Sequence, residues 1–318
     1  MRAIAAGLTD IGRERSHNED RFILLPEFHV FVVADGMGGH QSGEVASRMA
    51  AATIASYFRG QPPLGEGGAL ARLRDAVCDA NSKIFSRADD SRAHRGMGTT
   101  VVASVYSRSE NKMHVCHAGD SRAYHLRAGR MVQLTRDHSL LSDALLERPE
   151  LTEADLAYLP RNVITRALGI APTVDVDATS CDARPGDVFL LCSDGLHGLV
   201  EDSVIVSIIE ANPSLTEACQ RLVDEANRNG GKDNITAVLV RIEEDDEPWS
   251  SKSPRVLSAA RGEGVTIVDE PTEDMPAERA AAEGGASSDG TAGAGESADA
   301  RAGDVHGSGA DGSGADGG

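Results

Sequence analysis

The sequence predicts an α+β domain in which strands and helices form separate layers. Apolar runs with a period of two follow one another in blocks, and segments with a helical period are grouped instead of alternating with the strands. A chain of 318 residues can bury a sizeable core and allows, by length, about two domains.

The first part of the chain predicts three strands followed by two helices. Apolar runs predict strands at Ala3 to Leu8, Phe22 to Leu25 and Val30 to Ala34. The apolar residues of Ser42 to Phe58 recur with a helical period, with Ser42 as a candidate cap, and Ala69 to Ala88 repeats the pattern. We expect these two helices to cover one face of a sheet.

From Gly98 onward the period returns to that of β-structure. Four apolar runs separated by short polar turns predict an antiparallel meander: Thr99 to Tyr106, Met113 to Ala118, Ala123 to Leu126 and Met131 to Leu134. Residues His138 to Leu159 then form two short helical stretches split by Pro149. Such an excursion between strands is typical of a lid or a binding loop.

The last part of the folded region predicts two strands, two helices and a final strand. The strands are expected at Val174 to Ala178 and Val188 to Cys192, the helices at Ser203 to Glu210 and Leu215 to Arg228, and the final strand at Ile235 to Ile242. We therefore place the folded domain at residues 1 to 242.

Residues 243 to 318 have a different composition. They contain 18 acidic and 5 basic residues among many Ala, Gly and Ser, and so carry most of the net charge of −19. Such a segment buries too little apolar surface to offset the entropy of ordering, so we expect a disordered acidic tail. Its β-like run, Gly264 to Pro271, is either part of a solvated tether or a strand that adds to a partner's sheet edge.

Charge and cysteine usage narrow the class of protein. Without the tail the charges nearly balance, so neither nucleic acid nor an anionic membrane is an expected partner. The five cysteines form no C-x-x-C pair, and most lie in apolar surroundings, which indicates buried free thiols in a reducing compartment. No signal peptide or membrane-spanning run is evident. We expect a cytoplasmic protein.

Asp35 marks the first candidate site. It follows the apolar run Val30 to Ala34 and precedes Gly36, Met37 and two further glycines. A carboxylate at the end of a strand is held rigidly, and glycines after it let the backbone turn and offer a carbonyl oxygen to the same ligand. A strand followed by a turn that Asp35 merely supports has the same pattern.

Other acidic residues lie in similar positions and favour a metal site. Each lies at the end of a predicted strand: Glu19, Asp20, Asp120, Asp194 and Asp233. Carboxylates and carbonyls without Cys or His at zinc spacing suit Mg²⁺ or Mn²⁺, and a pair of such ions is a recurring device for attack on phosphorus. Arg15 is either a bidentate phosphate ligand or a solvated arginine in a charged loop.

Eight segments of the sequence resemble the metal-dependent protein phosphatases of type 2C, and the bacterial branch of that family in particular. They occur in the family's order and cover about residues 1 to 242. The segments are RSHNED at Arg15 to Asp20, ADGMGGHQSGE at Ala34 to Glu44, GMGTT at Gly96 to Thr100, HAGDSRAY at His117 to Tyr124, RDHS at Arg136 to Ser139, RNVITRALG at Arg161 to Gly169, LLCSDGL at Leu190 to Leu196 and GGKDNIT at Gly230 to Thr236.

The resemblance implies a fold and a set of site residues. The implied fold is a four-layer sandwich of two antiparallel β-sheets flanked by pairs of helices, with a mobile flap at about residues 137 to 169. By resemblance, Asp35 bridges two catalytic ions and Arg15 binds the substrate phosphate. The remaining implied ligands are Asp194 and Asp233 at the first ion, Glu19 and the Gly36 carbonyl at the second, Asp20 as an outer acid, and Asp120 with Asp194 at a weaker third ion.

The resemblance also implies an activity. It is the hydrolysis of phosphoserine and phosphothreonine by attack of metal-bound water, with Mn²⁺ or Mg²⁺ as cofactor. The implied partners are phosphorylated proteins, including Ser/Thr protein kinases, and the implied state is a monomer. The alternative is a weakly active or inactive member that binds phosphoproteins. Because Met37 stands where animal members have a histidine, the general acid is left open between His40 and water on the third ion.

Overall fold

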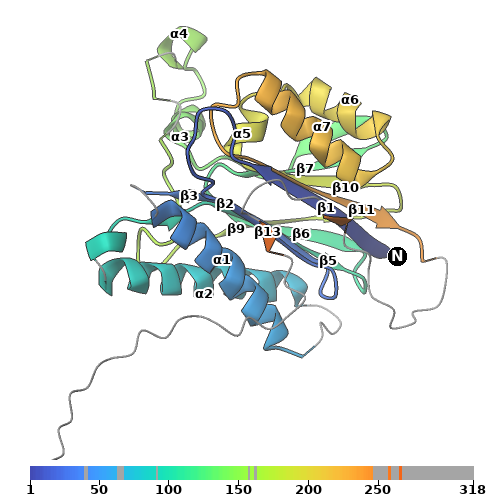
Figure 1. Cartoon of the computed structure of the whole chain (residues 1–318), viewed down its shortest axis with the longest axis horizontal. Helices are drawn as coiled ribbons and strands as arrows, with labels where there is room; N and C mark the ends of the chain where they lie inside the picture. Colours follow the sequence, from blue (N-terminus) through green and yellow to red (C-terminus); the bar gives the residue numbers. More distant parts are fainter. Residues whose placement is uncertain are drawn as a thin grey trace, which may run out of the picture. The chain divides into compact units, whose positions relative to one another are not determined.

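The computed structural model describes residues 1–38, 42–62, 68–90, 92–156, 158–160 and 163–245, and the backbone of 257–258 and 265–266. Within Met1–Thr272, two β-sheets lie face to face and each carries helices on its outer side (Figure 1). The predicted α+β sandwich of four layers is therefore confirmed.

The first sheet, which we call sheet A, brings the N-terminal strand beside the last long strand. β1 and β11 pair antiparallel over nine residues, from Arg2 opposite Glu243 to Asp10 opposite Ile235. Among the described residues the order of sheet A is β12 (Leu257–Ser258), β1 (Arg2–Asp10), β11 (Ile235–Glu243), β10 (Val188–Cys192), β7 (Arg122–Arg127) and β8 (Arg130–Gln133).

The second sheet, sheet B, contains the strand that carries Asp35. The register of its first long pair places Asp20 directly opposite Asp35. In the described part of the chain its order is β13 (Val265–Thr266), β2 (Asp20–Leu25), β3 (Val30–Met37), β5 (Val101–Ser107), β6 (Lys112–Ala118) and β9 (Asp177–Asp182), with β4 (Gly98–Thr99) paired to the end of β3.

Apolar side chains fill the three spaces between the four layers. One core joins sheet B to α1 (Ser42–Arg59) and α2 (Ala69–Asp90), the two helices predicted to cover one face. A second joins sheet A to α6 (Asp202–Ala211) and α7 (Leu215–Arg228). The third lies between the sheets and contains Phe22, Phe31 and Phe189.

The predicted antiparallel meander is wrong, because the chain changes sheets in the middle of it. β6 pairs with β5 and β9 in sheet B, whereas β7 pairs with β8 and β10 in sheet A. The change occurs at Gly119, whose φ is +115 and where an added Cβ would lie 2.6 Å from Cβ of Thr100. Period-two patterns identify strands but leave their partners open, so the sequence did not reveal the crossing.

Two strand boundaries also differ from the prediction. Asp35 does not end its strand, because Gly36 and Met37 continue β3 and pair with Thr99 and Gly98 of β4. The predicted strand at Val174 to Ala178 starts only at Asp177. Val176 is buried in the core beneath α1 and α2, so the apolar run reflects burial and not strand pairing.

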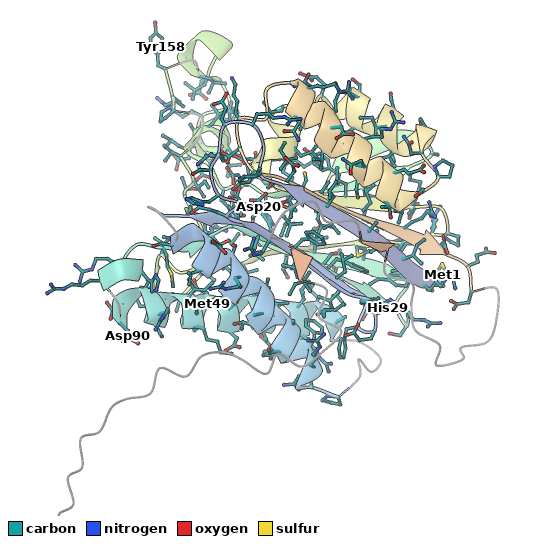
Figure 2. All side chains as sticks on the ribbon, viewed as in Figure 1. Met1, Asp20, His29, Met49, Asp90 and Tyr158 are labelled. Atoms are coloured by element: carbon teal, nitrogen blue, oxygen red, sulfur yellow. The ribbon has the colours of Figure 1, made fainter. Side chains whose placement is uncertain are left out.

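The segment at residues 137–169, the flap segment, contains the two predicted short helices, α3 (Leu140–Glu147) and α4 (Glu153–Leu156). Ser139 caps α3 through a hydrogen bond from the Ser142 amide, and none of the α3 residues is buried. Tyr158 lies at the far end of this segment, where 89% of its surface is exposed (Figure 2).

The chain stays in contact with the folded unit beyond Ile242. β11 runs to Glu243, and Asp245 forms ion pairs with the Met1 amine at 3.0 Å and with Arg108 at 2.6 Å. β12 pairs parallel with β1, and β13, inside the run Gly264 to Pro271, pairs parallel with β2. That run adds two residues to the chain's own sheet. The rest of the predicted tail lies outside the described residues.

No helix in the described ranges is both long and apolar enough to span a membrane.

Candidate metal and phosphate site

The acidic residues predicted as ligands meet around Asp35, between the two sheets. Asp35 interacts electrostatically with Asp20, Asp120, Asp194 and Asp233, and Arg15 with Asp35, Asp233 and Glu19. The residues come from β2, β3, the β6–β7 connection, the start of α5 (Asp194–His197) and the residues before β11. Asp20 lies between the helical layers at the end of the sandwich remote from Met1 (Figure 2).

The backbone around Asp35 is held on both sides by two threonines. The Asp35 amide donates to Oγ1 of Thr100 at 3.1 Å, and the Asp35 carbonyl accepts from Oγ1 of Thr99 and from the Thr100 amide, both at 2.8 Å. Burial raises the pKa of Asp35 well above its usual value, and the neighbouring carboxylates raise it further. The site therefore has a rigid central carboxylate in a strongly negative environment.

Asp20 is fully buried beside Asp35. Its Oδ2 accepts hydrogen bonds from the hydroxyls of Ser193 at 2.7 Å and Thr236 at 2.6 Å. Burial raises the pKa of Asp20 to about 7, although these two hydrogen bonds act in the opposite direction. One carboxylate oxygen thus accepts two hydrogen bonds from the protein, and the other, Oδ1, is buried without a hydrogen-bond partner among the described residues.

Glu19 is packed against two glycines. A Cβ at Gly43 would lie 2.8 Å from the Glu19 carboxylate, and one at Gly36 would lie 2.1 Å from the Gly43 carbonyl oxygen. The Gly36 amide donates to the Glu19 carbonyl at 3.1 Å. Partial burial raises the pKa of Glu19. The two glycines therefore bring Glu19 close to the Gly36 backbone, and these are the two ligands predicted for the second ion.

Asp120 and Asp194 lie on the sheet A side of the cluster. Burial raises the pKa of Asp120 to about 7, with a further contribution from the charge of Asp194, and burial also raises the pKa of Asp194. The Asp120 carbonyl accepts a hydrogen bond at 3.0 Å from Nε2 of His197, which belongs to the same short helix as Asp194. That bond ties the two predicted third-ion residues to each other.

Arg15 reaches into the site and does not lie free in the charged loop. Its Nη2 lies 2.6 Å from Oδ2 of Asp233, and the side chains of Arg15 and Asp233 are 51% and 34% exposed. The charges of Asp233, Asp35 and Glu19 raise the pKa of Arg15 against the opposing effect of partial burial. A half-exposed guanidinium beside a cluster of carboxylates can contact both the acids and an incoming anion.

The acids fit divalent cations. Four buried carboxylate oxygens have no hydrogen-bond partner within the described structure: Oε1 of Glu19, Oδ1 of Asp20, Oδ1 of Asp120 and Oδ1 of Asp194. A buried charged acceptor without a partner is costly, and a hard cation with oxygen ligands removes that cost. His40, the other candidate general acid, lies outside the described residues.

Sequence reasoning missed the polar residues that position the ligands. Asn234 accepts from the Glu19 amide at 2.8 Å and donates to the carbonyls of Ile11 and His17 at 3.0 and 2.9 Å, so it shapes the loop that carries Arg15. Ser193 and Thr236 hold Asp20 as described above. The sequence did contain a signal for these residues, because each of them adjoins a predicted ligand or lies in a buried strand.

The fold and the site together define a metal-dependent hydrolase of phosphate esters. The family model described as protein phosphatase 2C matches residues 12–239. A serine/threonine phosphatase stp of Listeria welshimeri is 37% identical over 237 residues, covering 73% of this chain and 93% of that protein. The chain therefore belongs to the protein phosphatase 2C family and is a protein serine/threonine phosphatase.

Two further comparisons extend the agreement to structure. The serine/threonine protein phosphatase PstP of Mycobacterium tuberculosis is 34% identical over 258 residues, which cover 81% of this chain and 48% of that protein. The crystal structure of the catalytic domain of PstP in complex with 2 manganese ions has a TM-score of 0.67 and 35% identity, covering 76% of this chain and 99% of that one.

Proposed function

We propose that this chain hydrolyses phosphoserine and phosphothreonine in proteins with two divalent cations, Mn²⁺ or Mg²⁺, held around Asp35. The single observation that carries the proposal is the set of four unpartnered carboxylate oxygens beside a half-exposed arginine. PstP, a relative with two manganese ions in its catalytic domain, supports the number of ions. When bound, the cations activate water and neutralise charge on the phosphoryl oxygens.

The roles proposed for the ligands are those that the resemblance to the family implies. Asp35 would hold both ions. Asp194 and Asp233 would complete the first site, Glu19 and the Gly36 carbonyl the second, and Asp120 with Asp194 a weaker third. Asp20 remains an outer acid, because Ser193 and Thr236 already use one of its oxygens.

Arg15 orients the substrate in this proposal. Its guanidinium presents several donors in one plane, so it can hold a phosphoryl group by two hydrogen bonds while the ester oxygen leaves. A fixed phosphoryl group presents phosphorus to the attacking water and lowers the entropic part of the barrier. Arg15 has to loosen its contact with Asp233 to do so, and a cation that draws on the Asp233 carboxylate favours that change.

Direct hydrolysis, without a phosphoenzyme, fits the nucleophiles that are present. Burial raises the pKa of Cys116 and Cys219 to about 12 and that of Cys181 to about 11, so these thiols stay protonated. The Ser193 hydroxyl is fully buried and donates to Asp20. Nothing among the described residues favours the inactive, phosphoprotein-binding alternative.

We also propose a domain boundary, a substrate class, an oligomeric state and a compartment for the enzyme. Residues 1 to 242 form the catalytic domain, with the flap segment beside the site, and the tail that follows is not needed for chemistry. Phosphorylated proteins, Ser/Thr kinases among them, are the proposed substrates of a monomeric enzyme. The five free cysteines support a reducing, cytoplasmic compartment.

The direct test is the release of phosphate from a phosphothreonine peptide by the full-length chain. We expect turnover with Mn²⁺ or Mg²⁺, none after treatment with EDTA, and recovery when Mn²⁺ is returned. A protein that binds the phosphopeptide in the presence of Mn²⁺ but releases no phosphate would instead support the non-catalytic alternative.

A further inference from the structure

Four side chains outside the acidic site meet at the base of the flap segment. His117 belongs to β6 and Asp177 to β9, where they are register partners, while His138 and Arg166 belong to the two ends of the flap segment. The rings of His117 and His138 stack with centroids 4.6 Å apart. Asp177 lies 3.3 Å from Nε2 of His138 and 2.7 Å from Nη1 of Arg166.

A metal site is the first interpretation of this cluster of side chains. Among the described residues, His117, His138 and Asp177 place ligand atoms within 4.8 Å of one another. The hydrogen bonds argue against it. The Gly119 amide donates to Nδ1 of His138 at 3.1 Å, so the proton of the neutral ring is on Nε2, which faces Asp177. The nitrogen that a metal would need is therefore a donor.

The near-parallel rings give a second reason. The planes of His117 and His138 are inclined by only 15°. A metal ion lies close to the plane of each imidazole that binds it, and one ion cannot lie in two stacked planes at once. Nη1 of Arg166 lies 3.1 Å from Nε2 of His138, but both atoms are donors, so neither bonds the other and Nη1 donates to Oδ1 of Asp177 at 2.7 Å. Asp177 is therefore an acceptor shared by His138 and Arg166.

His138 links Asp177 to Gly119, the residue that precedes Asp120 in the acidic site. Besides accepting from the Gly119 amide, His138 donates its own amide to the Gly119 carbonyl at 3.0 Å. It thus holds both peptide groups of Gly119, and the next residue is Asp120. The backbone passes close to Thr100 at this point, because a Cβ added at Gly119 would lie 2.6 Å from Cβ of Thr100. Rotation of the His138 ring would therefore move or loosen Asp120.

Arg166 links Asp177 to the other end of the flap segment. Its Nη1 also donates to the Asp175 carbonyl at 3.1 Å. The two ends of the segment are joined to each other, because the Thr165 amide donates to the His138 carbonyl at 2.9 Å and Ser139 forms a bridge with Ile164. Asp177 attaches this joined base to the edge strand β9, in addition to the backbone bonds that join His138 to Gly119 and Leu168 to Thr99.

We propose that Asp177 is a positioning residue that fastens both ends of the flap segment to β9 and, through His138, sets the position of Asp120. This inference rests on the proposed function for the part that concerns Asp120 as a metal ligand. The attachment of the flap segment is independent of it. The aspartate touches no substrate and no proposed ligand directly.

Hydrogen exchange of the full-length protein tests the attachment without any assay of activity. In Asp177→Ala we expect the amides of His138 and Thr165 to exchange roughly 10-fold faster or more, because the joined base loses its attachment to β9 and keeps only its bonds to Gly119 and Thr99. Asp175→Ala is the matched control, since the Asp175 carboxylate is 76% exposed and lies 3.9 Å from Nη1 of Arg166, against 2.7 Å for Asp177, while the Asp175 carbonyl is retained. Equal protection in the two variants would overturn the proposal. If the alanine variant does not fold, Asp177→Asn, which keeps the shape and removes the charge, is measured in its place.

Calorimetry with Mn²⁺ tests the link to Asp120. The weak binding phase is identified as the one that disappears in Asp120→Ala. Residues that orient metal ligands commonly change metal affinity 10- to 100-fold, so for Asp177→Ala, one step further away, we expect weak-phase affinity to fall roughly 3- to 10-fold with the tight phase unchanged. An unchanged weak phase would overturn the role of Asp177 at Asp120.

A double-mutant cycle separates the effect of Asp177 through His138 from its effect through Arg166. His138→Asn keeps an oxygen that can accept from the Gly119 amide and removes the donor to Asp177. In that background Asp177→Ala should change weak-phase affinity less than about twofold, but should still speed exchange at Thr165 through Arg166. Full additivity of the two effects on Mn²⁺ binding would show that Asp177 does not act through His138. Absence of phosphatase activity in the wild type would refute the proposed function and leave the exchange result valid.

Discussion

Nη2 of Arg15 lies 2.6 Å from Oδ2 of Asp233, so the proposed phosphate ligand and a proposed metal ligand form an ion pair with each other. Each group satisfies the other while both are partly exposed to solvent. A cation at Asp233 and a phosphate at Arg15 offer each group a new partner of opposite charge, so binding of either favours binding of the other. Metal and substrate are therefore expected to bind with positive coupling.

Arg15→Ala tests the phosphate role. A hydrogen bond to a charged group contributes about 1.5 to 3 kcal/mol, so kcat/KM should fall roughly 10- to 150-fold, for small phosphate esters as well as for phosphopeptides. Arg13→Ala is the matched control, because Arg13 is also an exposed arginine of this loop and its backbone amide, not its side chain, donates to the Gly231 carbonyl. A loss confined to protein substrates would assign Arg15 to a docking surface.

Asp35→Asn tests the two-ion arrangement. The change removes one charge with little change in volume, so hydrolysis of para-nitrophenyl phosphate should be abolished and Mn²⁺ binding, measured by calorimetry, should weaken at both tight sites. The metal-free variant should be at least as stable to heat as the metal-free wild type, because burial and neighbouring carboxylates disfavour the Asp35 charge and raise its pKa. Near wild-type turnover would exclude Asp35 as a shared ligand.

His29 predicts a pH dependence of stability that is separate from the active site. Its pKa is lowered to about 4, mainly by burial and also by the charge of Arg108, while Asp245 acts in the opposite direction and the N-terminal amine lowers it further. The unfolded state then binds the proton more readily than the folded state. The contribution of neutral His29 is complete above the unfolded value of 6.5 and is lost as the pH falls toward 4.

The variant His29→Asn isolates this contribution. Asparagine tolerates the left-handed φ of +53 at this position and does not titrate. Urea unfolding at about pH 7 and about pH 5 should show that the wild type loses more stability than the variant, by up to about 1.4 kcal/mol per pH unit in this window. Parallel pH profiles for the two proteins would mean that His29 does not contribute.

Two truncations test where the folded unit ends. A chain that ends after Asp245 should keep small-ester turnover within about twofold, because it retains every proposed ligand. A chain that ends after Ile242 also loses the pairs of Glu243 with Arg2 and of Asp245 with Met1 and Arg108. Exposed ion pairs contribute about 0.2 to 1 kcal/mol each, so the three pairs together contribute roughly 0.6 to 3 kcal/mol. The melting temperature of this chain should lie roughly 1 to 12 °C below that of the chain ending after Asp245.

The same pair of chains tests the two short parallel strands. Both truncations remove β12 and β13, which pair with β1 and β2. If the chain ending after Asp245 melts well below the full-length protein, the residues up to Thr272 belong to the folded unit and the boundary at residue 242 is wrong. Equal melting temperatures of the chain ending after Asp245 and the full-length protein would support that boundary to within a few residues.

The sequence by itself determined the elements and the chemistry of the site. Helices at Ser42 and Leu215 and the strand at Val188 begin where their periodicity predicts, because burial of one face imposes that period. The acids were recognisable because carboxylates at the ends of apolar strands need a partner. Period and residue type are local properties, so local reasoning was sufficient for them.

Only the tertiary structure decided which elements are neighbours. The crossing at Gly119, the pairing of Arg15 with Asp233 and the support of Glu19 by Asn234 all join residues whose proximity no local pattern encodes. Asp177 shows this most clearly, since in sequence it is one acid inside the predicted strand Val174 to Ala178. It becomes the anchor of the flap segment because β9 pairs with β6 and places it opposite His117, beside His138 and Arg166.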